Sequence, residues 1–289
     1  MDLIVDNYRT RTGKALPTVA RPDPVVWGGG AGPLGDDELS AYARDGFHCT
    51  NPVIASHQIS ALFGDLELLH SSMQEDDPRV IRERTSGRIR TIFDIHELSA
   101  TAGTVASSPA IVDVARQILG SDVYIHQSRL NFKPGFGAGP FYWHSDFETW
   151  HAEDGMPTPR ALSVSIALTP NYVHNGSLMI MPGSHTTFVP CTRPTPNEHH
   201  RQSLSSDIPP AGIPADPSLM ELAEQYGIRL LTGAAGSGIF FDSNCIHGSN
   251  GNITPYPRSN LFLVYNSTDN QLKAPFAADT PRPNYLAHR

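Results

Sequence analysis

The feature that most constrains the fold of this chain is a period-two alternation of side-chain character that recurs in short segments, mostly in its later part. Successive side chains of a β-strand point to opposite faces of a sheet, so such segments predict strands. The predicted strands are 88–94, 122–133, 140–150, 161–168, 177–181, 228–232, 237–242 and 258–265. With 24 glycines and 25 prolines among 289 residues, the chain has enough turn formers to join strands this short.

Helical patterns lie mostly before these strands. Apolar residues recur at helical spacing over 56–73, and capping residues frame shorter helices over 36–46, 108–120 and 216–227. Early helices and late strands predict a layer of helices packed on an antiparallel β-sandwich or barrel. The expected fold class is therefore mainly β with flanking helices.

The domain organisation is expected to be simple. No internal repeat and no linker divides the chain, so residues 1–289 are interpreted as one domain. Residues 1–35 contain four prolines and a Gly-Gly-Gly run, which predict an extended N-terminal arm. Residues 190–216 are rich in proline, serine and histidine and predict a long mobile loop. Loops of that length are often functional lids.

Charge and cysteine content exclude several classes of protein. The formal net charge of −8 argues against a general affinity for nucleic acid or for an anionic membrane surface. No apolar run approaches the roughly 20 residues of a membrane span, and residues 1–10 lack the pattern of a secretory signal. Three widely spaced cysteines, Cys49, Cys191 and Cys245, fit a reducing compartment. A cytoplasmic protein is expected.

The predicted strands suggest a polar cavity. In the strand 122–133, one face carries the hydrogen-bonding side chains Gln127, Arg129, Asn131 and Lys133. The strand 161–168 has an apolar face that suits packing on helices, and a face of small residues that includes Ser165. Arg258 and Phe262 share a face of the strand 258–265, together with Asn260. Small and polar faces suit the inside of a barrel that leaves room for a ligand.

The segment FYWHSDFETWHAEDGMPTPR, residues 141–160, contains a candidate metal site. His144 and Asp146 are two residues apart and would project to the same face of a strand. A third ligand must come from elsewhere. The candidates are His151, His174, His185, His199, His200 and His247, and we favour His247 because it follows a strong predicted strand. Two histidines and one carboxylate are the ligand set of non-haem Fe(II) oxygenases, whereas zinc usually prefers four ligands with more nitrogen or sulfur.

Arg258 follows His247 by eleven residues in the sequence. A guanidinium inside a barrel is costly unless it is paired. It could bind the distal carboxylate of 2-oxoglutarate in a bidentate manner, or it could form a structural salt bridge. The proximity to His247 in sequence favours the first interpretation. The arginine-rich run 79–90 is instead interpreted as a solvated, salt-bridged face.

The same residues resemble a known family. The segment 141–160, together with HQSRLNFKPGF (126–136), MPGSH (181–185) and the stretch from His247 to Arg258, is similar to the ectoine hydroxylases. These belong to the phytanoyl-CoA dioxygenase-like superfamily of Fe(II)/2-oxoglutarate oxygenases. The resemblance extends over nearly the whole chain and implies a double-stranded β-helix, a jelly-roll or cupin-like barrel.

The resemblance also implies a reaction and its residues. His144, Asp146 and His247 would be the iron ligands and hence the catalytic centre, and Arg258 would bind 2-oxoglutarate with help from Arg129, Asn131, Ser165 and, with less support, Lys133. The implied reaction uses Fe(II), 2-oxoglutarate and O₂ to hydroxylate ectoine to 5-hydroxyectoine, an osmoprotective compatible solute, with release of succinate and CO₂. A homodimer is a further implication of the family.

Candidate substrate contacts follow from the chemistry of ectoine, which combines a carboxylate with a delocalised cation. Such a cation favours an aromatic wall. Trp150 and Glu148 share strand parity with His144 and Asp146 if the strand stays regular, and the other candidates are Gln127, Phe241 and Phe262. Two alternatives stay open. They are the same chemistry on another small zwitterion, such as a proline-like amino acid, and a cupin-like metal-binding protein that is not an oxygenase.

Overall fold

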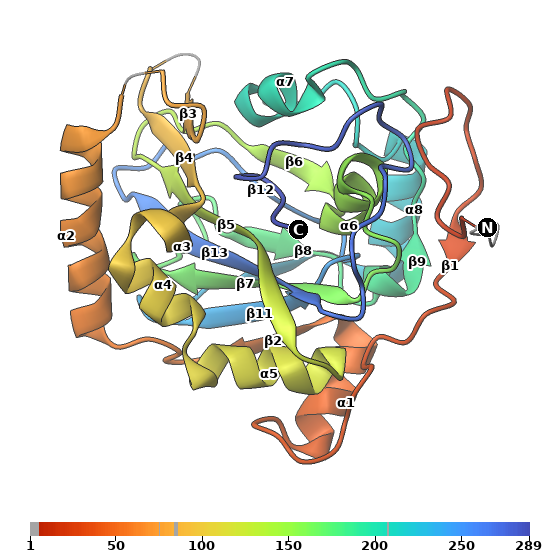
Figure 1. Ribbon diagram of the computed structural model, residues 1–289, viewed down its shortest axis with the longest axis horizontal. Helices are drawn as coiled ribbons and strands as arrows, with labels where there is room; N and C mark the ends of the chain where they lie inside the picture. The colour runs from red at the N-terminus through yellow and green to blue at the C-terminus, as the bar shows by residue number, and fades with distance from the viewer. Residues whose placement is uncertain (1–5, 75, 84–85, 207) are drawn as a thin grey trace.

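The computed structural model describes residues 6–74, 76–83, 86–206 and 208–289. Three of the sequence expectations therefore fall partly outside the described residues. These parts are the start of the expected arm, two residues of the arginine-rich run and one residue of the expected loop. Two antiparallel sheets dominate the described part (Figure 1). The larger sheet has seven strands in the order β2 (Phe47–Thr50), β11 (Gly238–Asp242), β7 (Ala161–Ala167), β13 (Arg258–Ser267), β5 (Val123–Lys133), β4 (Ile89–Phe93) and β3 (Val80–Arg82). The smaller sheet has the order β10 (Arg229–Leu231), β8 (Leu178–Ile180), β12 (His247–Ser249) and β6 (Phe141–His144).

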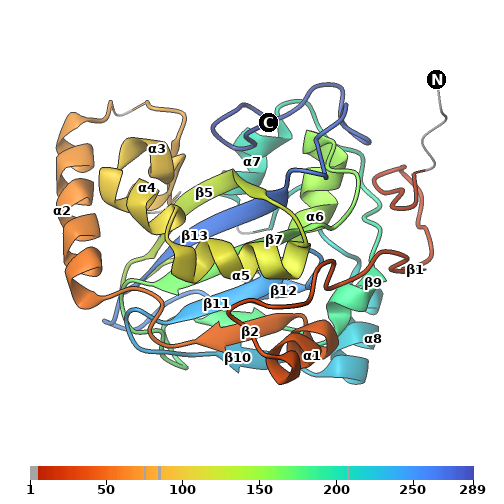
Figure 2. The ribbon, with the colours of Figure 1, turned by 60° about the horizontal axis from the view of Figure 1, so that its bottom comes forward.

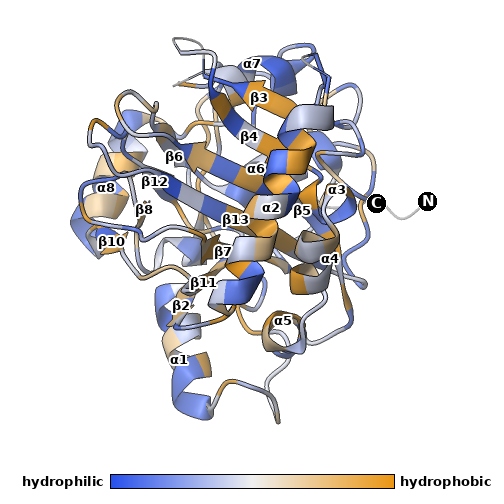
Figure 3. Cartoon of the chain, turned by 90° about the vertical axis from the view of Figure 1, so that its left-hand side faces the viewer, coloured by the Kyte–Doolittle hydropathy of each residue, from blue (hydrophilic) through white to orange (hydrophobic). Residues whose placement is uncertain are grey.

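The two sheets face each other around a shared interior. At one end this interior is apolar, where Leu178 and Ile180 of β8 pack against Ile239 and Phe241 of β11 and Phe262 of β13. Burial of apolar side chains from both sheets in one cluster is what holds a β-sandwich or barrel closed. The remainder of the interior is polar, and Figure 3 shows hydrophilic segments along β4, β6 and β12.

Helices cover the outer face of the larger sheet, as the sequence predicts. Leu162, Val164 and Ile166 of β7 lie in one buried cluster with side chains of α5. Figure 2 shows α5 lying across this sheet, with α2 and α4 beside it. The helices on or next to the outer face of the larger sheet are α1 (Asp36–Asp45), α2 (Ser56–Ser72), α3 (Ile95–Leu98), α4 (Ala100–Ala106) and α5 (Pro109–Leu119). Proline at the start of α5 and the left-handed Gly120 after it are the residues expected at helix ends.

The strand expected over 140–150 is wrong beyond His144. The chain leaves β6 there, enters α6 (Asp146–Thr149) and continues as a π-helix, η1 (Trp150–Asp154). Ser145 begins this turn, because its hydroxyl accepts a hydrogen bond from the backbone N–H of Glu148. An N-cap of this kind supplies one of the partners that the first turn of a helix lacks. Residues after His144 therefore follow helical rather than strand geometry.

The segment 190–216 is also more structured than a loop. It contains α7 (His199–Ser205), which lies over the open end of the barrel in Figure 1, and it leads into α8 (Asp216–Tyr226). The extended arm contributes β1 (Val19–Ala20), which pairs with β9 (Thr187–Phe188) just after the short 3₁₀ turn Ser184–Thr186. In the described ranges, no helix has both the length and the apolar run that crossing a bilayer requires.

Candidate active site

A cavity opens between the two sheets, below α7. Its volume is about 1100 Å³ with the open mouth included, and its wall combines charged, polar and aromatic side chains. Strands from both sheets, α6, η1, the segment around α7 and the C-terminal tail all contribute to it. A concave site with a few convergent polar groups in its wall is the usual form of a small-molecule binding site.

His144, Asp146 and His247 meet in the wall of this cavity. His144 is the last residue of β6 and pairs in register with His247, the first residue of β12, so the two rings lie 4.3 Å apart between centroids. Asp146 begins α6, and its carboxylate oxygens lie 3.6 Å from Nε2 of His144 and 3.9 Å from Nε2 of His247. One ligand atom from each residue lies within 4.8 Å of the other two. Three different backbone elements thus bring three ligand atoms to one point.

Hydrogen bonds orient these donors. Nδ1 of His144 donates to the Tyr142 carbonyl at 2.7 Å, and Nδ1 of His247 donates to the Cys245 carbonyl at 3.0 Å. Each ring is therefore held with its Nε2 toward Asp146, the orientation expected of a metal-binding histidine. The Ser163 hydroxyl donates to Oδ2 of Asp146 at 3.0 Å, which fixes the carboxylate.

Electrostatics favour the metal-binding forms of Asp146 and His247. Burial favours a protonated Asp146, but the neighbouring imidazoles and the Arg129 guanidinium outweigh it and hold the pKa of this carboxyl far below its usual value. Burial, reinforced by the nearby His144, lowers the pKa of His247 to about 4. A carboxylate and a neutral imidazole are the forms that coordinate metal. Two imidazoles and one carboxylate, with the cavity on their open side, fit a divalent iron ion.

Arg258 is the second unusual group in the wall. It is 2% exposed, and among the described residues neither Nε nor Nη2 has a hydrogen-bond partner. Burial lowers the pKa of its guanidinium to about 10. A buried cation with unsatisfied donors is costly unless a ligand completes it. The side chain is thus suited to an anion in the cavity, rather than to the structural salt bridge weighed above.

The other expected 2-oxoglutarate residues fall into two groups. Arg129 and Asn131 line the cavity. Ser165 and Lys133 lie behind the wall, where the Ser165 hydroxyl accepts from Asn260 at 2.9 Å and Nζ of Lys133 donates to the Gly139 carbonyl at 2.6 Å. Neither of these two is among the cavity-lining side chains in the described part of the chain. They can support the wall, but they do not form its surface.

The expected substrate contacts likewise divide into residues that line the cavity and residues that lie behind its wall. Gln127, Trp150 and Phe262 line the cavity, and Arg129 connects two of them. Its guanidinium donates to the Gln127 side chain and lies 4.9 Å from the centre of the Phe262 ring. Phe241 lies behind the candidate iron ligands, with its ring 5.0 Å from that of His247. Its position is that of a packing residue behind these ligands.

Glu148 is the clearest difference from the expectation. Because the chain turns helical at Asp146, strand parity no longer applies, and Glu148 points away from the cavity. Its carboxylate receives hydrogen bonds from Nε and Nη2 of Arg11, at 3.0 and 2.8 Å, and from the Thr10 hydroxyl. Arg11 also reaches Glu153 at 2.6 Å. The N-terminal arm is therefore tied to the helical turn that carries Asp146.

The sequence interpretation missed two arginines in the wall. Arg90 is only 3% exposed, pairs with Glu83 and lies 4.1 Å from the centre of the Phe141 ring, so the expectation of a solvated face is wrong for this residue. Arg282 reaches the cavity from the C-terminal tail and pairs with Asp154 at 2.6 Å. Arg90 alternates with apolar neighbours in a strand, which is a usable sequence signal. Arg282 lies in a segment without periodicity, so no sequence signal indicates its position in the wall.

Comparison with known proteins agrees with this geometry. Residues 42–260 match the model of the family described as Phytanoyl-CoA dioxygenase (PhyH). A relative named ectoine dioxygenase from Nocardia farcinica is 51% identical, over 99% of this chain and 94% of its own length. Two solved structures of EctD from S. alaskensis each cover 98% of this chain and 95% of their own length. One, with 2-oxoglutarate and 5-hydroxyectoine, is 42% identical with a TM-score of 0.86, and the other, with bound Fe, is 41% identical with a TM-score of 0.84.

These likenesses establish the fold and the family together. The two facing antiparallel sheets are the double-stranded β-helix that the resemblance implied, since the EctD structures superimpose over nearly the whole chain. The matched family model spans most of the chain, including all three candidate iron ligands and Arg258. The chain belongs to the phytanoyl-CoA dioxygenase family and, within it, to the ectoine dioxygenases.

Proposed function

We propose that this chain is an Fe(II)- and 2-oxoglutarate-dependent dioxygenase that hydroxylates ectoine to 5-hydroxyectoine, with release of succinate and CO₂. The proposal rests on two features that lie in one cavity. One is the cluster of His144, Asp146 and His247, and the other is the buried Arg258, whose Nε and Nη2 have no hydrogen-bond partner among the described residues. The names of the relatives and the ligands of the EctD structure support the choice of substrate.

The iron site would consist of Nε2 of His144, Nε2 of His247 and a carboxylate oxygen of Asp146. When bound together with 2-oxoglutarate, iron(II) activates O₂ and couples oxidative decarboxylation of the cosubstrate to hydroxylation of the substrate. The chain's own contribution is to orient both imidazoles through their Nδ1 hydrogen bonds, to hold the carboxylate through Ser163, and to leave the cavity side of the three donors open. The presence of a carboxylate at Asp146 favours hydroxylation over halogenation, which in this superfamily uses a small residue at that position.

Arg258 would bind the distal carboxylate of 2-oxoglutarate. Its free Nε and Nη2 atoms form one edge of the guanidinium, the edge that receives a carboxylate in a bidentate manner. Asn131 lines the same cavity and can orient the cosubstrate. Ser165 and Lys133 act indirectly in this scheme. The Ser165 hydroxyl accepts a hydrogen bond from the Asn260 side chain, and Nζ of Lys133 donates one to the Gly139 carbonyl.

Ectoine would bind in the part of the cavity lined by Gln127, Arg129, Trp150 and Phe262. Its delocalised cation suits the faces of the aromatic rings, and its carboxylate suits the guanidinium groups of Arg129 and Arg282. Burial lowers the pKa of Arg129, and the charge of the neighbouring Asp146 carboxylate opposes this shift. Held by charge at one end and by rings at the other, the substrate presents its ring carbons to the metal side and excludes water from it.

The decisive experiment is anaerobic reconstitution of the full chain with Fe(II), 2-oxoglutarate and ectoine, followed by exposure to O₂. We expect succinate, and a product heavier than ectoine by one oxygen atom, in equal amounts by mass spectrometry. A panel with proline in place of ectoine tests the second candidate substrate, and hydroxylated proline without hydroxyectoine would reverse the assignment. Absence of any 2-oxoglutarate-dependent O₂ uptake would instead favour a metal-binding protein that is not an oxygenase.

Two further parts of the proposal concern the setting of the enzyme. We infer a homodimer from the family resemblance, and a cytoplasmic location from the cysteines, since Cys49, Cys191 and Cys245 are all free thiols in the structure. Sedimentation equilibrium of the purified chain tests the first, and a monomer at micromolar concentration would contradict it. Fractionation of the producing cells tests the second.

A further inference from the structure

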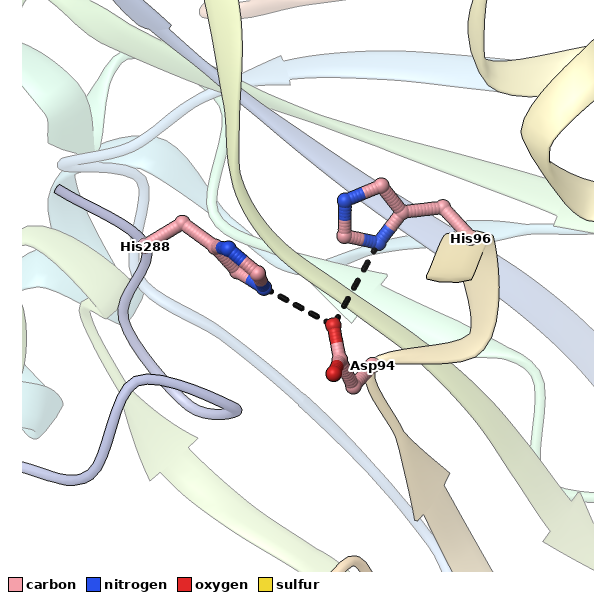
Figure 4. A group of neighbouring side chains, drawn as sticks. All are labelled: Asp94, His96 and His288. Atoms are coloured by element: carbon pink, nitrogen blue, oxygen red, sulfur yellow. Dashed lines mark hydrogen bonds and ion pairs between the residues drawn. The ribbon is translucent and has the colours of Figure 1, made fainter. Parts of the chain in front are cut away.

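A second cluster of metal-binding side chains lies behind the cavity wall, apart from the iron site. It consists of Asp94, His96 and His288 (Figure 4). Asp94 directly follows the cavity-lining Phe93 at the end of β4, His96 lies in α3, and His288 lies in the C-terminal tail, residues 272–289. The cluster therefore joins two segments nearly 200 residues apart in the sequence.

The geometry of this cluster is close to that of a metal site. Nε2 of His288 lies 2.8 Å from Oδ1 of Asp94, and Nδ1 of His96 lies 3.7 Å from the same oxygen. One ligand atom from each residue lies within 4.8 Å of the others. Ligands bound at about 2.1 Å to one transition-metal ion are about 3 to 3.5 Å apart. Small side-chain rotations are enough to reach that arrangement, and the hydrogen bond between His96 Nδ1 and Ser128 would be exchanged for the ion.

The surroundings support each ligand. Asp94 has a left-handed backbone with φ of 60°, a conformation rare for a residue with a side chain, and its N–H is fixed by the Ser128 carbonyl at 2.9 Å. Nε2 of His96 lies 3.6 Å from a carboxylate oxygen of Glu97, which supplies the carboxylate behind a metal-binding imidazole. The His288 backbone N–H donates to the His126 carbonyl at 2.8 Å.

The charge of the cluster and its access to solvent also favour a bound cation. Two carboxylates, Asp94 and Glu97, face two imidazoles, so a divalent cation would neutralise the group. The side chains of Asp94, His96 and His288 are 13–21% exposed, so an ion can enter from solvent.

We propose that Asp94, His96 and His288 bind a second divalent transition-metal ion, of the class represented by zinc, which pins the C-terminal tail to the barrel. This site shares no ligand with the proposed iron centre and does not depend on the proposed reaction. Imidazole and carboxylate donors suit zinc, and water can complete a tetrahedral site.

Pinning the tail has a consequence for the cavity. The Leu286 carbonyl accepts a hydrogen bond from the Gln127 side chain at 2.7 Å, and Arg282 lines the cavity while bound to Asp154. His288 is two residues beyond Leu286. An ion at this cluster would therefore hold in place the segment that supplies one arginine of the cavity wall and fixes the side chain of Gln127.

Metal stoichiometry of the untagged full chain tests the proposal. After dialysis against Zn²⁺ and removal of loosely bound ion, we expect two zinc ions per wild-type chain, one at each cluster. His288→Gln, Asp94→Asn and His247→Gln should each retain one, and the double variant His247→Gln/His288→Gln should retain none. The control His70→Gln, at an exposed position of α2, should retain two. One ion in the wild type, or two in both His288→Gln and Asp94→Asn, would overturn the proposal.

Hydrogen exchange tests the pinning separately. In the His247→Gln background, which leaves only the second cluster, Zn²⁺ should slow amide exchange of residues 282–289 at least several-fold. The same addition to His247→Gln/His288→Gln should leave their exchange unchanged. If zinc binds with the expected stoichiometry but exchange in the tail does not change, the pinning role is wrong although the site exists.

Discussion

At the scale of single residues, Asp146 is the group on which the proposed iron centre depends most. It is the only carboxylate of the three ligands, and burial would raise its pKa if the neighbouring imidazoles and the Arg129 guanidinium did not hold it down. Asp146→Asn keeps the shape but removes the anionic oxygen that a divalent ion requires. We expect the affinity for Fe(II) and the rate of hydroxylation each to fall by about 100-fold or more.

Fe(II) titration under anaerobic conditions and succinate release measure the two effects of Asp146→Asn. Asp113→Asn, a matched change at a half-exposed position of α5, should alter neither. A variant that loses the carboxylate yet binds iron and hydroxylates at the wild-type rate would exclude Asp146 from the ligand set.

Glu153 provides a pH prediction at the same scale. Burial raises the pKa of this carboxyl, but the hydrogen bond from His199 and the charge of Arg11 outweigh it, and the pKa falls to about 2. A depressed pKa in the folded state means stability that is present above the unfolded value of about 4.3 and is lost as pH falls toward 2. We expect the unfolding free energy of Glu153→Gln to be less sensitive to acid than that of the wild type, by at most about 3 kcal/mol.

Urea unfolding between pH 7 and pH 3 measures this difference. Glu67→Gln, at an exposed position of α2, serves as the control and should follow the wild-type curve. Parallel curves for wild type and Glu153→Gln would show that Glu153 has no depressed pKa in the folded protein.

At the scale of elements, the helical turn α6 and η1 is held by the N-terminal arm. Arg11 is the cation shared by Glu148 and Glu153, and all three side chains are at most 4% exposed. Arg11→Met would leave the Glu148 carboxylate buried without its cation and would remove one of the partners of Glu153. Breaking a buried pair in this way costs about 3–5 kcal/mol, whereas replacing the pair by apolar residues costs far less.

We therefore expect Arg11→Met to lower the unfolding free energy by about 3–5 kcal/mol, and Arg11→Met/Glu148→Met to recover part of the loss. Equilibrium unfolding in urea at pH 7 gives both values. A double variant as unstable as the sum of the single ones would contradict the pairing. Iron affinity measured on the same proteins reports whether the arm also positions Asp146.

The segment 190–216 gives a second prediction for an element. It contributes α7 and several cavity-lining side chains, among them Leu204 and Ile213. Closing segments of this kind exclude water and bind the substrate in place before reaction. If it acts as a lid, replacing 200–212 by a short Gly-Ser linker should increase succinate formation that is not matched by hydroxyectoine. Equal amounts of the two products, as in the wild type, would show that the segment is not a lid.

At the scale of the whole molecule, the sequence predicted the barrel where the two faces of a strand differ sharply. β7 is recognisable because Leu162, Val164 and Ile166 alternate with small residues, and β5 because a row of polar side chains alternates with a mostly apolar row. These strands lie at the centre of the larger sheet, where one face meets helices and the other meets the cavity. β12, with only three residues, is too short for such a pattern to be visible.

The placement of the site depended on contacts that no local pattern shows. The helical turn at Asp146 had one usable signal, the Ser145-x-x-Glu148 spacing of a capping box, and alternation of neighbouring residues concealed it. Arg282 lies 128 residues from its partner Asp154, and nothing in its own segment indicates that it reaches the cavity. Long-range pairing of charged residues is a property of the folded chain rather than of any segment.

The last prediction concerns the stability of the whole chain without ligands. A buried Arg258 with two unsatisfied donors is unfavourable in the empty protein and becomes favourable once an anion pairs with it. Arg258→Met fills similar space without a charge. We therefore expect the metal-free, cosubstrate-free variant to be as stable as the wild type or more stable, by about 1–3 kcal/mol, although it loses 2-oxoglutarate binding.

Thermal unfolding of both proteins, with and without 2-oxoglutarate and Fe(II), separates the two effects. Ligand at 100 times its dissociation constant adds about 2.7 kcal/mol to the stability of a protein that binds it. The melting temperature of the wild type should therefore rise on addition of 2-oxoglutarate at constant Fe(II), and that of Arg258→Met should not. Arg88→Met, at an exposed arginine beside β4, should behave as the wild type in both conditions. If Arg258→Met lowers the stability of the empty protein by several kcal/mol, this guanidinium supports the fold rather than awaiting a ligand, and the assignment of Arg258 to the cosubstrate fails.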